Sequence, residues 1–373
     1  MTQPIDDPRH DREAGARDAT LDTTRIDDVR IAAVRALVSP AVLLEELPVT
    51  AGIEALIETT RVDIGRVLHG SDDRLVVVVG PCSIHDHDAA IAYARRLKGL
   101  ADALREDLLV VMRVYFEKPR TTVGWKGYIN DPRLDGSFHI NEGLRRAREL
   151  LLEISALGLP AGTEFLDLLT PQYVADLIAW GAIGARTTES QSHRQLASGL
   201  SCPVGFKNGT DGSVQVASDA VLAAAHPHSF MGMTKMGMAA IFETRGNPDG
   251  HVILRGGRLP NYGAEAVAAA CAVLRKAGLR EQVMVDCSHA NSAKDHRRQI
   301  EVAADLGRQL AGGERRIVGV MVESHLHEGR QDLKPGVPLQ SGVSITDACL
   351  GWHDSEPLLR GLAEAVRLRR ASA

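Results

Sequence analysis

The sequence lacks any hydrophobic run close to the ~20 residues that a membrane-spanning helix needs, and its polar N-terminus has no signal-peptide core. Its five cysteines are odd in number and widely scattered, which argues against a disulfide framework and fits a reducing cytoplasm. The formal net charge is only −5, so charge gives no reason to expect nucleic acid or a membrane as a partner. We therefore expect a cytoplasmic protein.

Hydrophobic residues make up 44% and charged residues 24% of the 373-residue chain, which suits one large α/β barrel with additions or two smaller domains. Leu75–Val79 is an apolar run of one Leu and four Val, and Gly80-Pro81 closes it. A short run this apolar and this rich in β-branched residues indicates a strand buried on both faces. Such strands are typical of parallel sheets that helices cover on the outside.

Short apolar segments alternate with amphipathic ones from Leu75 onward, which predicts a parallel (β/α)8 TIM barrel. We expect strands at 75–80, 108–114, 160–165, 181–186, 203–207, 250–255, 282–287 and 316–322. We expect helices at 88–103, 141–157, 171–179, 190–198, 214–225, 263–277, 294–310 and 356–370. A β-hairpin at 228–233 and 239–244 interrupts this pattern before the sixth barrel strand.

The pattern divides the chain into three regions. Residues 1–25 are rich in Asp, Arg and Thr and predict a disordered tail. Residues 26–70 form an N-terminal extension whose part from 41 to 69 has helical spacing of apolar residues. Residues 71–373 form the barrel, with the hairpin insertion at 228–245.

Polar residues follow the expected strands at the carboxyl ends, which meet on one rim of such a barrel. Glu164 ends the third strand, and seven cations lie in or beside apolar strands: Arg113, Lys118, Arg120, Lys126, Arg186, Lys207 and Arg255. Any one of these cations could form a salt bridge to a neighbouring strand end. Together they exceed the nearby carboxylates, which indicates a site for anionic substrates carrying phosphate or carboxylate groups.

A second group at the strand ends combines one thiol, one imidazole and two carboxylates: Cys82, His289, Glu323 and Asp347. This mixed set of donors suits a divalent transition metal such as Mn, Fe, Co or Zn. The alternative is a Cys82 nucleophile with His289 as its base, which leaves Glu323 and Asp347 without a role.

The sequence closely resembles the type I 3-deoxy-D-arabino-heptulosonate-7-phosphate (DAHP) synthases from Ile26 to the C-terminus. The matching segments are GPCSIHD (80–86), MRVYFEKPRTTVGWKG (112–127), GTEFLD (162–167), WGAIGARTTESQ (180–191), GFKNGTDG (205–212), ILRGG (253–257), SHANS (288–292), VGVMVESH (318–325) and SITDACLGW (344–352). The resemblance implies an enzyme that condenses phosphoenolpyruvate with erythrose 4-phosphate and releases phosphate, in the first step of the shikimate pathway.

The resemblance also implies a role for each group of residues. The four donors Cys82, His289, Glu323 and Asp347 would bind the metal, and His289 would also serve in catalysis with Lys118 and Glu164. Arg113 and Lys207 would face the carboxylate of phosphoenolpyruvate and Arg186 and Arg255 its phosphate, with Lys118, Lys126 and Ala185 nearby. Arg120 and Thr121 would hold the sugar phosphate. Glu164 would orient water, and Lys118 would donate to the developing alkoxide.

In this family the N-terminal extension and the hairpin form a site for a feedback-inhibiting aromatic amino acid. The matching positions are Asp27, Asp28, Pro171, Gln172, Leu200, Ser201, Phe230, Gly232 and Phe242. Gly232 predicts tyrosine as the inhibitor, because phenylalanine-sensitive relatives tend to have Ser there, although Phe242 is larger than the aliphatic residue we would expect. The resemblance further suggests a homodimer or tetramer whose N-terminal segment crosses between subunits.

Two other functions stay open. A related synthase uses arabinose 5-phosphate to make 3-deoxy-octulosonate 8-phosphate, and it shares the barrel and the chemistry. The segment KPRTTVGWKG (118–127) and the N-terminal extension favour the erythrose enzyme. A non-catalytic sensor of aromatic amino acids would need neither the four metal donors nor the cations.

Overall fold

The structure is a computed structural model that describes residues 26–120, 122–334 and 336–372. The chain divides into two units, residues 1–37 and 38–373. In the first unit, the described residues 26–37 contain no helix or strand, and Ile31 N donates to Asp28 O at 2.9 Å. The predicted tail over 1–25 lies outside the described residues.

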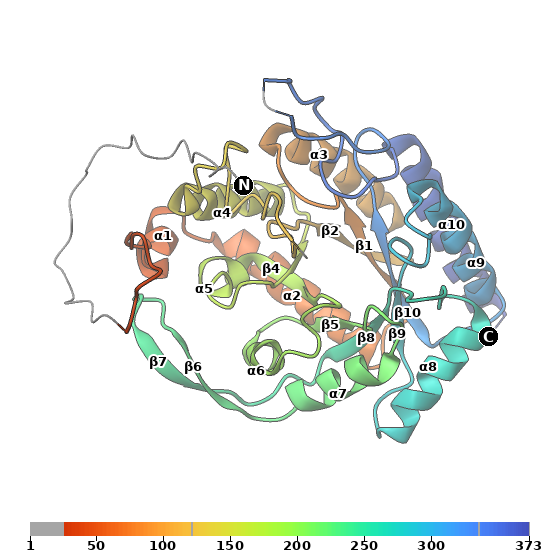
Figure 1. Ribbon diagram of the computed structural model, residues 1–373. Coiled ribbons are helices and arrows are strands. Elements are labelled where there is room, and N and C mark those ends of the chain that lie inside the picture. Colours follow the sequence, from red (N-terminus) through yellow and green to blue (C-terminus); the bar gives the residue numbers. More distant parts are fainter. Residues whose placement is uncertain (1–25, 121, 335, 373) are drawn as a thin grey trace, which may run out of the picture. The chain divides into compact units, whose positions relative to one another are not determined.

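Eight parallel strands of the second unit close into a barrel, in the order β1-β10-β9-β8-β5-β4-β3-β2 (Figure 1). The predicted TIM barrel is therefore confirmed, and the hairpin lies before the sixth barrel strand as expected. The barrel strands are β1 (Leu75–Gly80), β2 (Leu108–Arg113), β3 (Ala161–Glu164), β4 (Ile178–Ile183), β5 (Val204–Lys207), β8 (Gly250–Leu254), β9 (Val283–Asp286) and β10 (Ile317–Glu323).

Helices follow the strands and cover the outside of the barrel (Figure 1). They are α3 (His87–Leu104), α4 (Ile140–Ala156), α5 (Pro171–Val174) with the 3-10 turn η1 (Ala175–Leu177), α6 (Gln191–Gly199), α7 (Val214–Ala224), α8 (Ala264–Lys276), the 3-10 turn η2 (His296–Arg298), α9 (Gln299–Ala311) and α10 (Trp352–Ala371). No helix in the described part of the chain is long and apolar enough to cross a membrane.

Alternation along β1 explains its apolar sequence. Val77 and Val79 belong to the outer core between strands and helices, whereas Val76 and Val78 belong to a separate inner cluster. The inner cluster also contains Trp180 and residues of α2 (Ala51–Leu68), which follows α1 (Pro40–Glu46). Because α2 packs against the start of β4, where Arg61 donates to the carbonyl of Ile178, it covers the amino end of the barrel. The carboxyl end of the strands stays available for a site.

Four predicted elements have wrong boundaries. The helix expected at 171–179 divides into α5 and η1 and ends at Leu177, because β4 begins at Ile178. The fourth strand ends at Ile183 rather than 186, because residues 177–183 are apolar throughout and carry no boundary signal. The helix expected from 294 begins at Gln299, since Ala293 and Lys294 have left-handed backbones with φ of 51° and 64°. The last helix, expected from 356, begins at Trp352 and contains Pro357 in its second turn.

The hairpin consists of β6 (Ser229–Met233) and β7 (Ala239–Glu243), paired antiparallel with Gly232 opposite Ala240. The rings of Phe230 and Phe242 stack across it with centroids 6.0 Å apart. Its other face exposes Met231 and Ile241. The two faces of the hairpin therefore differ, and the aromatic face is the one that can enclose a ligand.

Candidate active site and metal centre

The turn after β1 brings Cys82 into the carboxyl end of the barrel. Gly80 makes this possible, because its φ is +156° and a Cβ there would lie 2.7 Å from the carbonyl oxygen of Arg113. Arg113 in turn donates from Nε to Pro81 O at 3.1 Å and from Nη2 to Cys82 O at 3.2 Å. The Gly-Pro sequence thus lets two neighbouring strands hold the thiol in a fixed place.

Glu323 at the end of β10 is fully buried and has two hydrogen-bond donors. Arg113 Nη2 donates to its Oε1 at 2.8 Å, and Ser288 Oγ donates to its Oε2 at 2.7 Å. Burial alone would raise the pKa of Glu323, but Arg113 and His289 outweigh it and lower the pKa to about 2. The residue is therefore an anion at neutral pH, in a place where it can ligate a cation.

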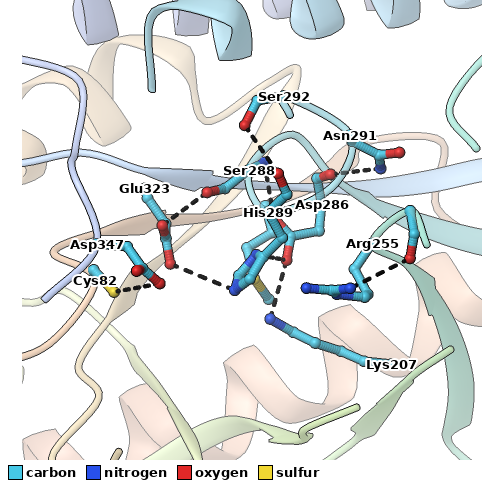
Figure 2. A network of polar contacts seen from close by, with 12 residues as sticks. Cys82, Lys207, Arg255, Asp286, Ser288, His289, Asn291, Ser292, Glu323 and Asp347 are labelled. Atoms are coloured by element: carbon cyan, nitrogen blue, oxygen red, sulfur yellow. Dashed lines mark hydrogen bonds and ion pairs between the residues drawn. The ribbon is translucent and has the colours of Figure 1, made fainter. Parts of the chain in front are cut away.

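Three of the four predicted metal donors lie together. One ligand atom each of Cys82, Glu323 and Asp347 lies within 4.8 Å of the other two, and Cys82 Sγ is 3.8 Å from Asp347 Oδ2. Cys82 and Glu323 are buried, whereas Asp347 is exposed. His289 lies beside this group, with its Nε2 4.0 Å from Glu323 Oε1 (Figure 2). A thiolate, two carboxylates and a nearby imidazole suit a divalent transition metal.

The cations differ in their surroundings. Arg113 and Lys207 are buried, and each has a carboxylate partner, Glu323 for Arg113 and Asp286 for Lys207 at 3.0 Å. Lys118 donates to Cys82 Sγ at 3.2 Å. Arg113 and Lys207 therefore form the salt bridges that the sequence left open as an alternative. Their charges are partly neutralised, so the site has less excess positive charge for a substrate than the count of seven cations indicates.

Unlike Arg113 and Lys207, Arg186 and Arg255 form no ion pair with a carboxylate among the residues that the structure describes. Arg186 is exposed and Arg255 half-buried. Burial lowers the pKa of the Arg255 guanidinium, and the nearby positive charge of Arg186 lowers it further, against the opposing effect of Asp286. Two guanidinium groups that repel each other electrostatically at one end of a barrel suit a phosphate or another multivalent anion.

The remaining predicted substrate residues lie further out or on the loop after β2. Arg120 and Lys126 are exposed, and Arg120 Nε donates to Trp125 O at 2.7 Å. Thr121 lies outside the described residues. Ala185 is half-buried in the turn after β4. Because this strand ends three residues earlier than predicted, Ala185 and Arg186 are loop residues.

Glu164 ends β3, and its exposed fraction is only 7%. Its carboxylate lies over Gly184, where an added Cβ would be 2.4 Å from Glu164 Oε1. The glycine therefore leaves the space that this carboxylate fills.

Seven of the predicted effector positions line one cavity of about 1060 Å³ between the α5 segment and the hairpin: Pro171, Gln172, Leu200, Ser201, Phe230, Gly232 and Phe242. Asp167, Lys235 and Arg245 add charged groups to its wall. The cavity thus offers apolar, cationic and anionic contacts within the second unit. Asp27 and Asp28 belong to the unit of residues 1–37, so their part in this site stays a prediction.

Asp286 and Ser288 have no role predicted from the sequence, although both contact predicted site residues. Asp286 Oδ2 lies 3.0 Å from Lys207 Nζ and 2.9 Å from His289 Nδ1 (Figure 2). Burial would raise the pKa of Asp286, but Lys207 and then His289 hold it well below its usual value. An acidic residue that ends an otherwise apolar strand is the signal that could have identified it.

A closed parallel barrel with cations and clustered metal donors at its carboxyl end defines an enzyme that acts on anionic substrates. The comparisons with known proteins give the family: residues 49–360 match the model of the DAHP synthetase I family, and the chain belongs to this family. The predicted family and enzyme class are thereby confirmed.

The chain is 60% identical over 344 residues to the Phe-sensitive phospho-2-dehydro-3-deoxyheptonate aldolase of Escherichia coli K12, covering 92% of this chain and 98% of that relative. It is 54% identical to the tyrosine-inhibited aldolase of Schizosaccharomyces pombe, with 94% and 96% covered. The solved structure of the aldolase from Francisella tularensis SCHU S4 has a TM-score of 0.89 and 53% identity, covering 91% of this chain and 99% of that one.

Proposed function

We propose that the chain condenses phosphoenolpyruvate with erythrose 4-phosphate and water to give DAHP and inorganic phosphate, the first step of the shikimate pathway. The observation that carries this proposal is the group of Cys82, Glu323 and Asp347 within 4.8 Å of one another beside the cations at the same barrel end. The names of the relatives support it, since both curated relatives are phospho-2-dehydro-3-deoxyheptonate aldolases.

Cys82, Glu323, Asp347 and His289 would hold a divalent metal, and the donor set fits Mn, Fe, Co or Zn. The metal would polarise the aldehyde oxygen of the sugar phosphate as a Lewis acid. Burial and then the Glu323 carboxylate raise the pKa of the Cys82 thiol, so the thiol must lose its proton when the ion binds.

The cations would bind the enol substrate by both of its ends. Arg186 and Arg255, which lack carboxylate partners among the described residues, are proposed to hold its phosphate. Lys207 and Arg113 are proposed to face its carboxylate, and their charges are partly balanced by Asp286 and Glu323. This preorganised positive charge would keep two anionic substrates close enough to react.

Lys118 and Glu164 are proposed to move and place protons. The ammonium of Lys118 lies 3.2 Å from both the thiol and the carbonyl of Cys82, which supports its proposed role as donor to an alkoxide beside the metal donors. Glu164 would orient the water that adds to the former enol carbon, whose carbon–oxygen bond then breaks to release phosphate. Arg120 and Thr121 are proposed for the sugar phosphate, and Lys126 and Ala185 for the surrounding contacts.

The test is to incubate the purified chain with phosphoenolpyruvate, erythrose 4-phosphate and Mn²⁺ while following the enol absorbance and the release of phosphate. We expect turnover with erythrose 4-phosphate and little with arabinose 5-phosphate. Preference for the five-carbon sugar would indicate the octulosonate activity, and no turnover with either would indicate a sensor. The Cys82→Ala variant should stay folded and make no product, and near-normal turnover in metal-depleted buffer would contradict the metal assignment.

We further propose feedback inhibition by an aromatic amino acid, with tyrosine favoured. The cavity lined by Phe230, Gly232 and Phe242 supports a site for an aromatic side chain. A Cβ on Gly232 would lie 3.0 Å from two ring atoms of Phe242, so any side chain there would narrow the cavity. The relatives include both a Phe-sensitive and a tyrosine-inhibited enzyme, so overall similarity does not choose between the two amino acids.

Inhibition curves with each aromatic amino acid separately test this proposal. We expect tyrosine to inhibit at the lowest concentration, and Gly232→Ser to weaken inhibition by tyrosine more than inhibition by phenylalanine. Asp27→Ala with Asp28→Ala should weaken inhibition without changing uninhibited turnover, since these residues are proposed to bind the ammonium of the effector. Inhibition by phenylalanine alone would refute the choice of tyrosine. The proposed dimer or tetramer can be tested by light scattering of the full chain.

A further inference from the structure

Asp286 lies at the centre of the site, and the proposed function gives this residue no role. Its side chain is fully buried at the end of β9, and both of its oxygens are in use. Oδ1 accepts from the backbone N of Ser288 at 2.9 Å, and Oδ2 accepts from Lys207 Nζ at 3.0 Å. Oδ2 also lies 2.9 Å from Nδ1 of His289. One carboxylate therefore contacts a residue proposed for phosphoenolpyruvate and a residue proposed for the metal (Figure 2).

Asp286 is the described group that can determine which nitrogen of His289 carries the proton. The contact has the distance of an ion pair but not the angle of a hydrogen bond, and Nδ1 is buried with no hydrogen-bond partner among the described residues. A small rotation of the ring would align Nδ1–H with Oδ2. The lone pair then lies on Nε2, on the side of the ring that faces Glu323 Oε1 at 4.0 Å. Two acceptors at that separation leave room for a cation between them.

The backbone around His289 is built to keep this geometry. His289 has a left-handed backbone with φ of 57°, a conformation that costs energy for a residue other than glycine. Asn291 holds the loop, since its Nδ2 donates to Asp286 O at 2.8 Å and to Leu254 O at 3.1 Å. The carbonyl of His289 accepts from Lys294 N at 2.8 Å. These contacts fix the loop, so the ring orientation depends on what the side chain meets.

We propose that Asp286 is a positioning residue that holds the His289 imidazole and the Lys207 ammonium on one carboxylate oxygen, and thereby couples binding of the metal to binding of phosphoenolpyruvate. The inference rests on the proposed function for the roles of His289 and Lys207. When a metal-binding histidine donates its second ring N–H to a carboxylate, the hydrogen bond orients the ring and makes the imidazole a better ligand. The same charge keeps Lys207 extended toward the barrel end rather than folded against another anion.

The matched variant is Asp286→Asn, which keeps the size of the side chain. An amide has one oxygen and one NH2 group, so it cannot accept from the backbone N–H of Ser288 on one side and from Lys207 and His289 on the other. We expect Mn²⁺ affinity, measured by electron paramagnetic resonance or calorimetry without substrate, to fall about 10- to 100-fold. The KM for phosphoenolpyruvate should rise at least about 10-fold, whereas the KM for erythrose 4-phosphate should change less than about 2-fold.

Asp107→Asn is the control. Asp107 is also a buried aspartate, but it pairs with Arg367 and Arg370 at 2.7 Å, outside the metal and substrate groups. The Asp107→Asn variant should have the Mn²⁺ affinity of the wild type and the same KM values for both substrates. In a His289→Ala background, the effect of Asp286→Asn on metal affinity should disappear, because Asp286 acts through the ring. An unchanged metal affinity in Asp286→Asn, or an undiminished effect in the double variant, would overturn the inference.

A measurement on the unmodified protein covers the case in which Asp286→Asn does not fold. Nitrogen-15 NMR of the imidazole of His289 in the metal-free chain should show the proton on Nδ1. A proton on Nε2 would overturn the inference. A wrong proposed function would give a different observation: the wild-type chain itself would bind Mn²⁺ or phosphoenolpyruvate poorly. A wrong role for Asp286 would leave binding by the wild type intact.

Discussion

Gly184 determines where the Glu164 carboxylate can lie, because an added Cβ at this position would be 2.4 Å from Glu164 Oε1. The obstructed atom is the end of a flexible side chain, so Gly184→Ala should displace the carboxylate at little cost in stability. We expect kcat to fall at least about 10-fold, since a positioned acid or base contributes about 10²- to 10⁴-fold to a rate. Steady-state kinetics and thermal melting check the two effects.

Gly99→Ala serves as the control for Gly184→Ala. Gly99 lies in α3 with nothing within 4 Å of an added Cβ, so alanine should raise helix stability by up to about 1 kcal/mol without changing kcat. A normal kcat in Gly184→Ala would contradict a catalytic role of Glu164 in its present place.

Glu117 is a buried carboxyl with a weak partner, since Thr170 Oγ1 donates to its Oε1 at 3.3 Å. Burial, with the nearby Asp167 carboxylate, raises the pKa of Glu117 to about 8 from 4.5. Between these values the folded chain binds a proton that the unfolded chain has lost. The free energy of unfolding should therefore fall as pH rises from about 5 to 8, by at most about 1.4 kcal/mol per pH unit from this group.

Glu117→Gln should remove this part of the pH dependence, because glutamine does not titrate. The measurement is the difference in unfolding free energy between the variant and the wild type, from denaturant titrations at pH 5, 6, 7 and 8. Exposed Glu45→Gln removes the same charge and should leave the slope unchanged. Parallel slopes for wild type and Glu117→Gln would show that the carboxyl is ionised over the whole range.

At the residue scale, the sequence predicts which side chains lie at the site but not which side chains pair with them. Cys82, Glu323 and Asp347 could be grouped because a barrel brings strand ends together, and each follows or ends a recognisable segment. The partners of Arg113 and Lys207 could not be predicted, because each carboxylate comes from a strand that is not adjacent to the strand of its cation in the barrel. Glu117 gave no signal, since it lies in a loop among charged residues and its burial follows from tertiary packing.

At the scale of elements, the barrel strands could be predicted because their apolar runs are short and closed by glycine, proline or charged residues. Seven of the eight predicted strands agree with the structure to within one residue at each end. The fourth strand failed because η1 and β4 follow each other without a polar residue between Leu177 and Ile183. Pairing with β3, which starts with Ala161 opposite Ile178, decides where that strand begins.

Arg148 joins α4 to the two elements beside it, and we expect its replacement to loosen them. Its guanidinium donates to Asp176 through both Nη atoms at 2.8 Å, to Leu47 O and to Tyr173 O. The side chain is 1% exposed, so Arg148→Lys leaves buried carbonyls without donors. We expect a loss of about 2–4 kcal/mol in unfolding free energy, seen as a lower Tm.

The same substitution should also affect inhibition, because Arg148 anchors Tyr173 next to the cavity residues Pro171 and Gln172. The concentration of effector for half-inhibition should rise while uninhibited turnover stays within about 2-fold of the wild type. Arg96→Lys, at an exposed position of α3, is the control and should change neither quantity. A Tm equal to that of the wild type would contradict this role of Arg148.

At the scale of the whole molecule, the proposed metal ligands come from places far apart along the chain. Cys82 follows β1, Glu323 ends β10, and Asp347 lies in the loop before α10. Because β1 and β10 are the strands whose pairing closes the barrel, an ion held by these residues bridges the closure. A ligand that binds only the folded state stabilises it by mass action.

Removal of the metal should therefore lower both activity and stability. At a free Mn²⁺ concentration 100 times Kd, we expect the folded state to gain about 2.7 kcal/mol over the chelator-treated chain, a shift of a few degrees in Tm. The gain should shrink as pH falls, because the raised pKa of Cys82 means that binding releases a proton. Cys82→Ala should lose most of the shift, whereas Cys202→Ala, a buried thiol outside the donor group, should keep it. An equal Tm with and without Mn²⁺, in a chain shown by electron paramagnetic resonance to bind the ion, would contradict a site that exists only in the folded chain.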